Sequence, residues 1–270
     1  MTSLIHIPEL RDTALTALVL CALSALALAS HLHVRHFDHR GVHTLQVYAA
    51  VLAAVTGFGL LVLGPGALGR GPAWGLLAGP VLGAAAAPLV AAADTAVTRR
   101  LGRRAAARPA PTAPSATAPR TRGTRAVGPA ARLAKATSST TSTATEQRWT
   151  ATRRDSDVAL PLAWLVAVGV LEECVFRGTL TGVALAQGAL PVRVLILTLA
   201  TAAFALSHIF FGWAQVAAKL PLSVTALALT LLTGNVLGAA VTHALFNARI
   251  WRYQNTVRAP RGARTGTARP

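Results

Sequence analysis

The chain has 270 residues, of which 53% are hydrophobic and 13% are charged, and its formal net charge is +17. A soluble domain normally carries about 25% charged residues, so this composition argues against a soluble protein if the apolar residues form long blocks. A bilayer core about 30 Å thick needs roughly 20 apolar residues of helix. The lengths of the apolar blocks therefore decide the class of protein.

Apolar blocks of about this length follow one another along the chain. They occupy residues 13–31, 44–68, 73–97, 158–187, 191–211, 216–233 and 235–250. The last two are short and nearly continuous, so six or eight spans are alternatives to seven. The first block does not resemble a secretory signal, because its apolar run exceeds the usual ~7–15 residues. We therefore predict an all-α, polytopic transmembrane helix bundle of about seven spans, integral to the cell membrane.

The connection at residues 31–43 reads HLHVRHFDHRGVH and contains five histidines with Asp38. A metal site is one interpretation, since imidazole binds zinc, copper and nickel. The spacing matches no zinc pattern, however, and arginines compete within the same segment. We favour a loop at the level of the lipid headgroups.

Basic residues gather in two segments beside the apolar blocks. Thirteen of the 26 Lys and Arg lie between Arg99 and Arg154, and six more lie between Arg249 and Arg269. Residues 105–150 are rich in Pro and Thr and have no hydrophobic period, so they cannot bury enough apolar surface to fold. The predicted parts are N-terminal transmembrane helices at 1–97, a disordered basic linker at 98–157, a second group of membrane helices at 158–250 and a basic tail at 251–270.

The distribution of charge predicts an orientation, because basic loops stay on the cytoplasmic side of a membrane. With seven spans and a cytoplasmic linker, 22 Lys and Arg fall inside, including Lys219, which we count because it lies near the loop at 212–215. Three fall outside: Arg11, Arg70 and Arg193. The N-terminus is then outside, and the linker and C-terminus are cytoplasmic.

The expected partner of the basic linker and tail is an anionic lipid surface. Each Lys or Arg near such a surface contributes about 1 kcal/mol. Nucleic acid is not expected as a partner, because the linker lacks interleaved aromatic residues apart from Trp149.

Polar residues are rare at bilayer depth in the C-terminal half. Within residues 158–270 the acids are Glu172 and Glu173, and the histidines are His208 and His243. Charged groups in a membrane are costly, so they indicate a functional site unless another role explains them. With Asn247, they place polar groups on three separate apolar blocks. A bundle can satisfy these groups only if the three faces turn toward one another.

Residues four apart share a face of a helix. Three such pairs occur in these blocks: Glu173 with Arg177, Phe204 with His208, and His243 with Asn247. Glu173 precedes Arg177, which is the better orientation for an ion pair. Glu172, offset by one residue, is left without a partner on its own helix.

These residue types are suited to peptide hydrolysis. A Glu in a low-dielectric pocket can take a proton from water, and a neighbouring His can hold that water. A second His with an Asn supplies donors for an oxyanion, where removing one donor typically costs about 2.7–4 kcal/mol.

The same segments resemble the motifs of the CPBP family (CaaX protease and bacteriocin-processing) of intramembrane glutamic endopeptidases. Residues 172–177 match its EExxxR motif, residues 204–208 its FxxxH motif and residues 243–247 its HxxxN motif, in the family's order. The resemblance covers roughly residues 158–250. It implies an intramembrane endopeptidase, without a cofactor, that acts on a protein or peptide substrate at the membrane.

The resemblance also implies roles for individual residues. Glu172 would be the base that activates water, with His208 as its partner. His243 and Asn247 would form the oxyanion site. The supporting residues would be Glu173, Arg177 and Phe204, the first two as a pair that braces the motif helix.

Several alternatives stay open. Glu172, His208 and His243 could bind zinc with an open fourth position, although no HExxH motif is present. The polar residues could merely hold helices together, or relay protons in an ion-coupled transporter, although we see no internal repeat. A non-enzymatic scaffold or immunity protein of the same fold is a further alternative. The substrate, and whether it is prenylated, are not predicted.

Overall fold

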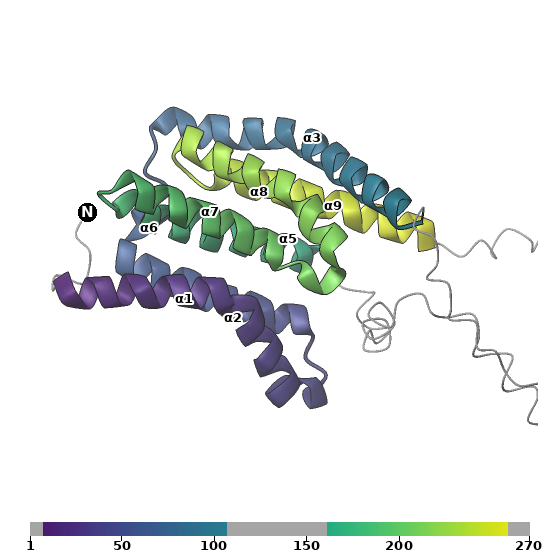
Figure 1. Ribbon diagram of the computed structural model, residues 1–270, viewed down its shortest axis with the longest axis horizontal. Helices are drawn as coiled ribbons and strands as arrows, with labels where there is room; N and C mark the ends of the chain where they lie inside the picture. The colour runs from purple at the N-terminus through teal and green to yellow at the C-terminus, as the bar shows by residue number, and fades with distance from the viewer. Residues whose placement is uncertain (1–7, 107–160, 259–270) are drawn as a thin grey trace, which may run out of the picture. The chain divides into compact units, whose positions relative to one another are not determined.

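A computed structural model of the protein describes residues 8–106 and 161–258, and these residues are all-α, as predicted. The helices are α1 (Pro8–Leu32), α2 (Thr44–Leu63), α3 (Ala73–Ala106), α5 (Leu162–Glu173), α6 (Leu180–Ala186), α7 (Leu190–Leu206), α8 (Trp213–Thr233) and α9 (Leu237–Arg258) (Figure 1). A π-helical segment, Cys174–Thr179, joins α5 to α6 in one continuous rod. Most of the predicted linker and the end of the tail lie outside the described residues.

The chain divides into two units. One contains residues up to Arg100 and from Leu160 onward, and every contact discussed below lies within it. The second contains Leu101–Ala159, of which the structure describes only the last turns of α3.

Four helical stretches in the described residues are long and apolar enough to cross a membrane. They are Leu10–Arg40, Thr44–Leu63, Ala73–Arg103 and Trp213–Thr233, and α7 is a shorter apolar helix. These helices identify an integral, multi-pass membrane protein. The finer prediction of seven spans remains a prediction, because α7 is short and a π segment interrupts the α5–α6 rod.

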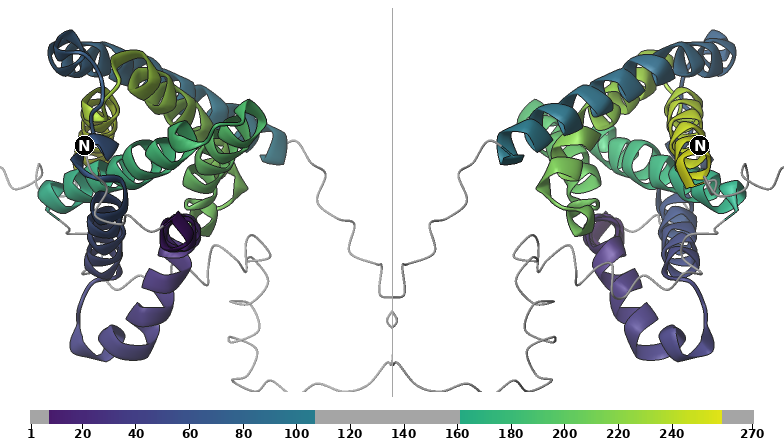
Figure 2. Two further views of the ribbon diagram at one scale, coloured as in Figure 1. Left: turned by 90° about the vertical axis from the view of Figure 1, so that its left-hand side faces the viewer. Right: turned by 90° about the vertical axis from the view of Figure 1, so that its right-hand side faces the viewer.

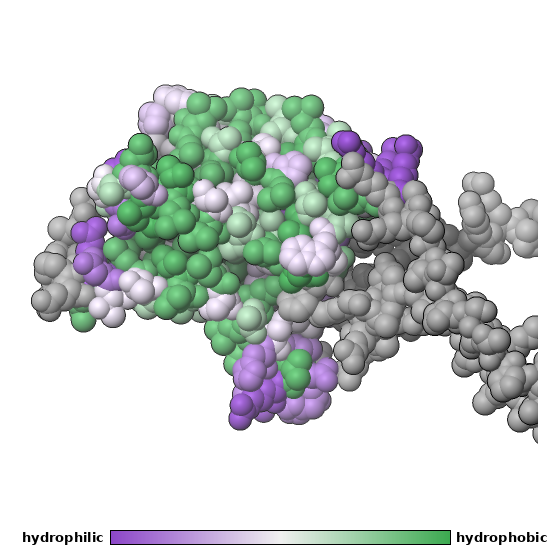
Figure 3. All heavy atoms as spheres, in the orientation of Figure 1, coloured by the Kyte–Doolittle hydropathy of each residue, from purple (hydrophilic) through white to green (hydrophobic). Residues whose placement is uncertain are grey.

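The outer surface of the helices is suited to lipid. Large apolar side chains are exposed on different helices, among them Leu77 and Leu89 on α3 and Leu195 on α7. Figure 3 shows a mostly hydrophobic face, with hydrophilic residues gathered on the projection that carries the α1–α2 connection. Exposed apolar surface of this extent is typical of a protein that contacts a membrane.

Several helix ends differ from the prediction. Helix α3 continues past residue 97 to Ala106, and α9 continues past residue 250 to Arg258. Both extensions are rich in arginine, which is a good helix former and interacts favourably with the C-terminal end of a helix. Helix α7 ends at Leu206 rather than at residue 211: a turn and the 3₁₀ segment Ile209–Phe211 lead to Gly212, whose φ of 93° does not continue a helix.

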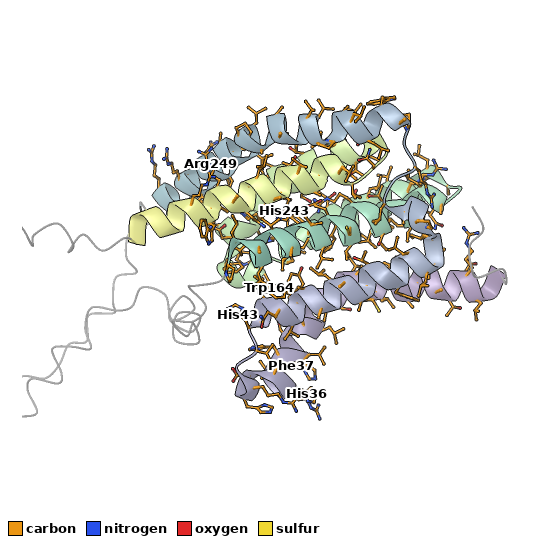
Figure 4. The ribbon with its side chains drawn as sticks, turned by 180° about the vertical axis from the view of Figure 1, so that it is seen from behind. His36, Phe37, His43, Trp164, His243 and Arg249 are labelled. Atoms are coloured by element: carbon orange, nitrogen blue, oxygen red, sulfur yellow. The ribbon has the colours of Figure 1, made fainter. Side chains whose placement is uncertain are left out.

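The histidine-rich connection forms a short π segment, His33–Phe37, and a 3₁₀ turn, Asp38–Arg40. It projects away from the other described helices, and Figure 4 shows His36 and Phe37 on it, well apart from His243 (Figures 2 and 4). Nε2 of His33 lies 2.9 Å from the Val42 carbonyl, and Nδ1 of His43 accepts from the Leu45 amide at the start of α2. Within the described residues, no group of three or more metal-ligating side chains is arranged to hold a metal.

Helix α3 packs tightly against the turn between α8 and α9. Gly71, just before α3, lies directly against Gly234 in this turn. The backbone amides of Arg70 and Gly71 both donate to the Gly234 carbonyl, over 2.8 and 2.9 Å. Along α3, Gly75, Gly79 and Gly83 follow at four-residue spacing, and a Cβ at Gly83 would collide with the Gly238 carbonyl. Small residues let membrane helices approach closely. This contact fixes the start of α9, the helix that carries His243.

Candidate active site

The rod of α5, the π segment and α6 carries Glu172 and Glu173, which are 5% and 0% exposed. The π segment begins directly after them, and π turns within helices frequently occur at functional sites. Residues 175–184 are buried without interruption. This part of the rod is therefore enclosed by other helices rather than by lipid.

Glu173 contacts both its own rod and α9. Its Oε2 lies 3.2 Å from Nε of Arg177, so the ion pair predicted from the four-residue spacing is present. Its Oε1 lies 2.7 Å from Nδ1 of His243. A carboxylate that bridges a guanidinium and an imidazole fixes the orientation of both.

Glu172 is bound by residues from other helices. Its Oε2 lies 3.6 Å from Nε2 of His243. Its Oε1 accepts a hydrogen bond from the Tyr48 hydroxyl on α2, over 2.9 Å. His243, which is 2% exposed, therefore lies between the two glutamates, one at each ring nitrogen. Figure 4 shows His243 on α9, inside the bundle.

Arg177 is held from three sides. Besides Glu173, it donates to the carbonyl and hydroxyl oxygens of Ser223 on α8, over 3.0 and 2.8 Å. Its guanidinium carbon lies 4.1 Å from the ring centroid of Phe204 on α7. A guanidinium over an aromatic face gains a cation–π interaction in addition to its ion pair.

Phe204 is the packing centre of the site. Its ring is fully buried and contacts Phe176, His208 and His243, at centroid distances of 5.7, 5.4 and 5.5 Å. Phe204, the first residue of the FxxxH motif, thus contacts Arg177 and both histidines.

His208 lies in the turn after α7, not on the helix that the sequence predicted, although its ring still contacts Phe204. Its Nδ1 lies 3.1 Å from the Phe204 carbonyl and 3.1 Å from the Ser207 hydroxyl. Because a carbonyl can only accept, Nδ1 carries the proton, and Nε2 presents a lone pair. Among the described residues, the hydrogen-bond partners of His208 do not include Glu172.

Asn247 lies one turn after His243 on α9, as predicted. Its Nδ2 donates one hydrogen to the Leu165 carbonyl on α5 over 2.9 Å. An amide nitrogen carries two hydrogens, so the second can be donated to another acceptor. Gly169 makes this approach of α5 and α9 possible, because a Cβ there would lie 2.9 Å from Asn247 Nδ2 and 3.2 Å from the His243 ring.

A second, partly buried ion pair lies nearby. Nζ of Lys219 is 3.0 Å from Asp94 Oδ1 on α3 and 4.1 Å from the ring centroid of Phe246. Lys219 lies within α8, inside the predicted block 216–233, and it is buried rather than part of the nearby loop at 212–215 with which its charge is counted. The sequence missed the pair because Asp94 is 125 residues away.

The predicted zinc ligands do not form a ligand group. Glu172 and His243 are close, with Oε2 of the glutamate 3.6 Å from Nε2 of the histidine. No set of three or more His, Cys, Asp or Glu side chains in the described residues is arranged for a metal ion.

Two carboxyls around one histidine, enclosed by membrane helices, form a candidate hydrolytic centre. Residues 154–249 match the family described as Type II CAAX prenyl endopeptidase Rce1-like. This part of the chain is a domain of that family, within the CPBP group, as the resemblance predicted. The family implies an intramembrane protease of the CAAX type. No curated protein and no solved structure matches the chain.

Proposed function

We propose that the protein is an intramembrane endopeptidase that hydrolyses a peptide bond with water activated by Glu172. The observation that carries this proposal is the arrangement of Glu172 and Glu173 around His243, in a buried part of a domain whose family implies proteolysis. The substrate is a protein or peptide at the membrane.

In the proposed step, the oxygen of water bonds to the carbonyl carbon of the substrate while one proton of that water passes to Glu172. His208 Nε2 accepts a hydrogen bond from the same water and orients it, since Nδ1 of this ring already binds Phe204 and Ser207. When the C–N bond breaks, the proton passes from Glu172 to the leaving nitrogen. The products are a carboxylic acid and an amine.

The carbonyl oxygen of the substrate becomes negatively charged during this attack. The proposed donors to it are Nε2 of His243, because Nδ1 of this ring already binds Glu173, and the second amide hydrogen of Asn247. Hydrogen-bond donors fixed in a low-dielectric site stabilise such charge strongly, because they need no reorganisation during the reaction. Glu173 and Arg177 support these groups and do not react.

We further propose that the N-terminus is outside, that the segment at 98–157 and the C-terminus are cytoplasmic, and that both basic segments contact anionic lipid. This proposal rests on the charge asymmetry between the two sides. Reporter fusions at about residue 125 and at the C-terminus should both report cytoplasm. A fusion that reports the outside would refute the orientation.

The activity can be tested with purified protein in liposomes and internally quenched peptides that end in a Cys-aliphatic-aliphatic-X motif. Half of the peptides carry a farnesyl group on the cysteine. We expect wild type to cleave at least one form and Glu172→Gln to cleave neither, and we expect cleavage to survive exhaustive chelation. Activity that disappears on chelation and returns with zinc would favour the zinc mechanism instead.

A further inference from the structure

Helix α2 lies outside the residues that match the family, yet it reaches the candidate active site. Tyr48 on this helix is 6% exposed and donates its hydroxyl to Oε1 of Glu172 over 2.9 Å. The two residues are 124 positions apart in the chain. A buried hydrogen bond to a carboxyl is among the stronger protein hydrogen bonds, so it holds the carboxyl in one orientation.

The position of α2 is itself fixed against the π segment. A Cβ at Gly59 would lie 2.6 Å from the Thr179 hydroxyl, so the two elements touch at a point where only glycine fits. Tyr48 and Gly59 therefore hold α2 against the rod at two places. The close contact at Gly59 therefore helps to fix the position of the Tyr48 hydroxyl relative to Glu172.

We propose that Tyr48 is a positioning residue of the active site, which fixes the orientation of the Glu172 carboxyl. The inference rests on the proposed function, and it makes α2, outside the family domain, part of the support of the active site. Oε1 of Glu172 is then occupied by Tyr48, and Oε2, on the side of His243, is the oxygen that receives the proton from water.

The hydrogen bond can be tested without any substrate. The infrared difference spectrum between a protein and its Glu172→Gln variant isolates the bands of the Glu172 carboxyl. These bands should shift when the difference is measured in a Tyr48→Phe background, because this change removes only the hydroxyl. Thr56→Val is the matched control, since it removes a buried hydroxyl from the same helix that has no hydrogen-bond partner among the described residues. Unshifted bands in Tyr48→Phe would overturn the contact.

The positioning role is tested by the rate of peptide cleavage. Tyr48→Phe should lower kcat about tenfold with KM and Tm nearly unchanged, because the hydrogen bond orients a reacting group and does not bind substrate. Thr56→Val, the matched control, should keep the wild-type kcat. A wild-type kcat in Tyr48→Phe would overturn the inference.

These outcomes are distinct from failure of the proposed function. If Glu172→Gln cleaves as fast as wild type, the proposed function fails, and the positioning role fails with it. If Glu172→Gln is inactive while Tyr48→Phe is fully active, the proposed function stands and the inference alone fails.

Discussion

Oε2 of Glu173 lies 3.2 Å from Nε of Arg177, and neither side chain is more than 2% exposed. The other oxygen of the same carboxylate, Oε1, lies at hydrogen-bond distance from Nδ1 of His243. Glu173 therefore supports two groups that belong to different helices. Its main role is expected in stability rather than in the chemical step.

Glu173→Gln should lower the melting temperature in detergent. It leaves Arg177 at membrane depth without a counter-charge, and removing one partner of a buried pair costs about 3–5 kcal/mol. The double variant Glu173→Gln with Arg177→Met should recover part of the loss. Asp12→Asn, which removes a carboxylate from an exposed position on α1, is the control. A Glu173→Gln protein with the melting temperature of wild type would contradict this supporting role of Glu173.

Asp94→Asn should also destabilise the protein, because it leaves Lys219 as a buried cation. The loss should be below the roughly 3–5 kcal/mol of a fully buried pair, because the Asp94 side chain is 19% exposed. Asp94→Asn combined with Lys219→Met should restore the melting temperature in large part, since the methionine can still pack on Phe246. An unchanged melting temperature in Asp94→Asn alone would show that the pair is not needed.

Gly169→Ala tests the close approach of α5 and α9. The added methyl group would press on Asn247 and His243, and overpacking typically costs about 1–3 kcal/mol. Cleavage should fall along with stability, because both contacted residues belong to the proposed oxyanion site. Gly57→Ala is the control, since a Cβ there meets nothing within 4 Å, and it should be neutral or stabilising by up to about 1 kcal/mol. Equal melting temperatures and rates for the two variants would contradict this role of Gly169.

The sequence predicted the part of the site that is encoded locally. The Glu173–Arg177 pair follows from a four-residue spacing within one rod. The helical prediction for His208 was wrong because the chain leaves α7 after Leu206 and turns through Ile209–Phe211 to Gly212, whose φ is 93°. An apolar run such as 209–211 does not show by itself where a helix ends.

The contacts between the two halves of the chain could not be predicted in this way. Tyr48 reaches Glu172 across 124 residues, and Lys219 reaches Asp94 across 125. A periodic pattern shows which face of a helix is buried, but not which helix lies against that face. The apolar block at 44–68 gave no reason to choose Tyr48 until α2 was placed beside the rod. Similarly, Lys219, counted with the charges near the loop at 212–215, needed its partner on α3 before it could be placed inside the bundle.

The division of labour between the adjacent glutamates is tested most directly by measuring cleavage rate and melting temperature for Glu172→Gln and Glu173→Gln side by side. Glu172→Gln keeps the shape of the side chain and removes the base. It should therefore lower the rate by about 10²–10⁴-fold and leave the melting temperature close to that of wild type. Glu173→Gln should lower the melting temperature and reduce the rate only in part. A Glu172→Gln protein that loses stability but still cleaves, beside a stable and inactive Glu173→Gln protein, would reverse the assignment and contradict the account.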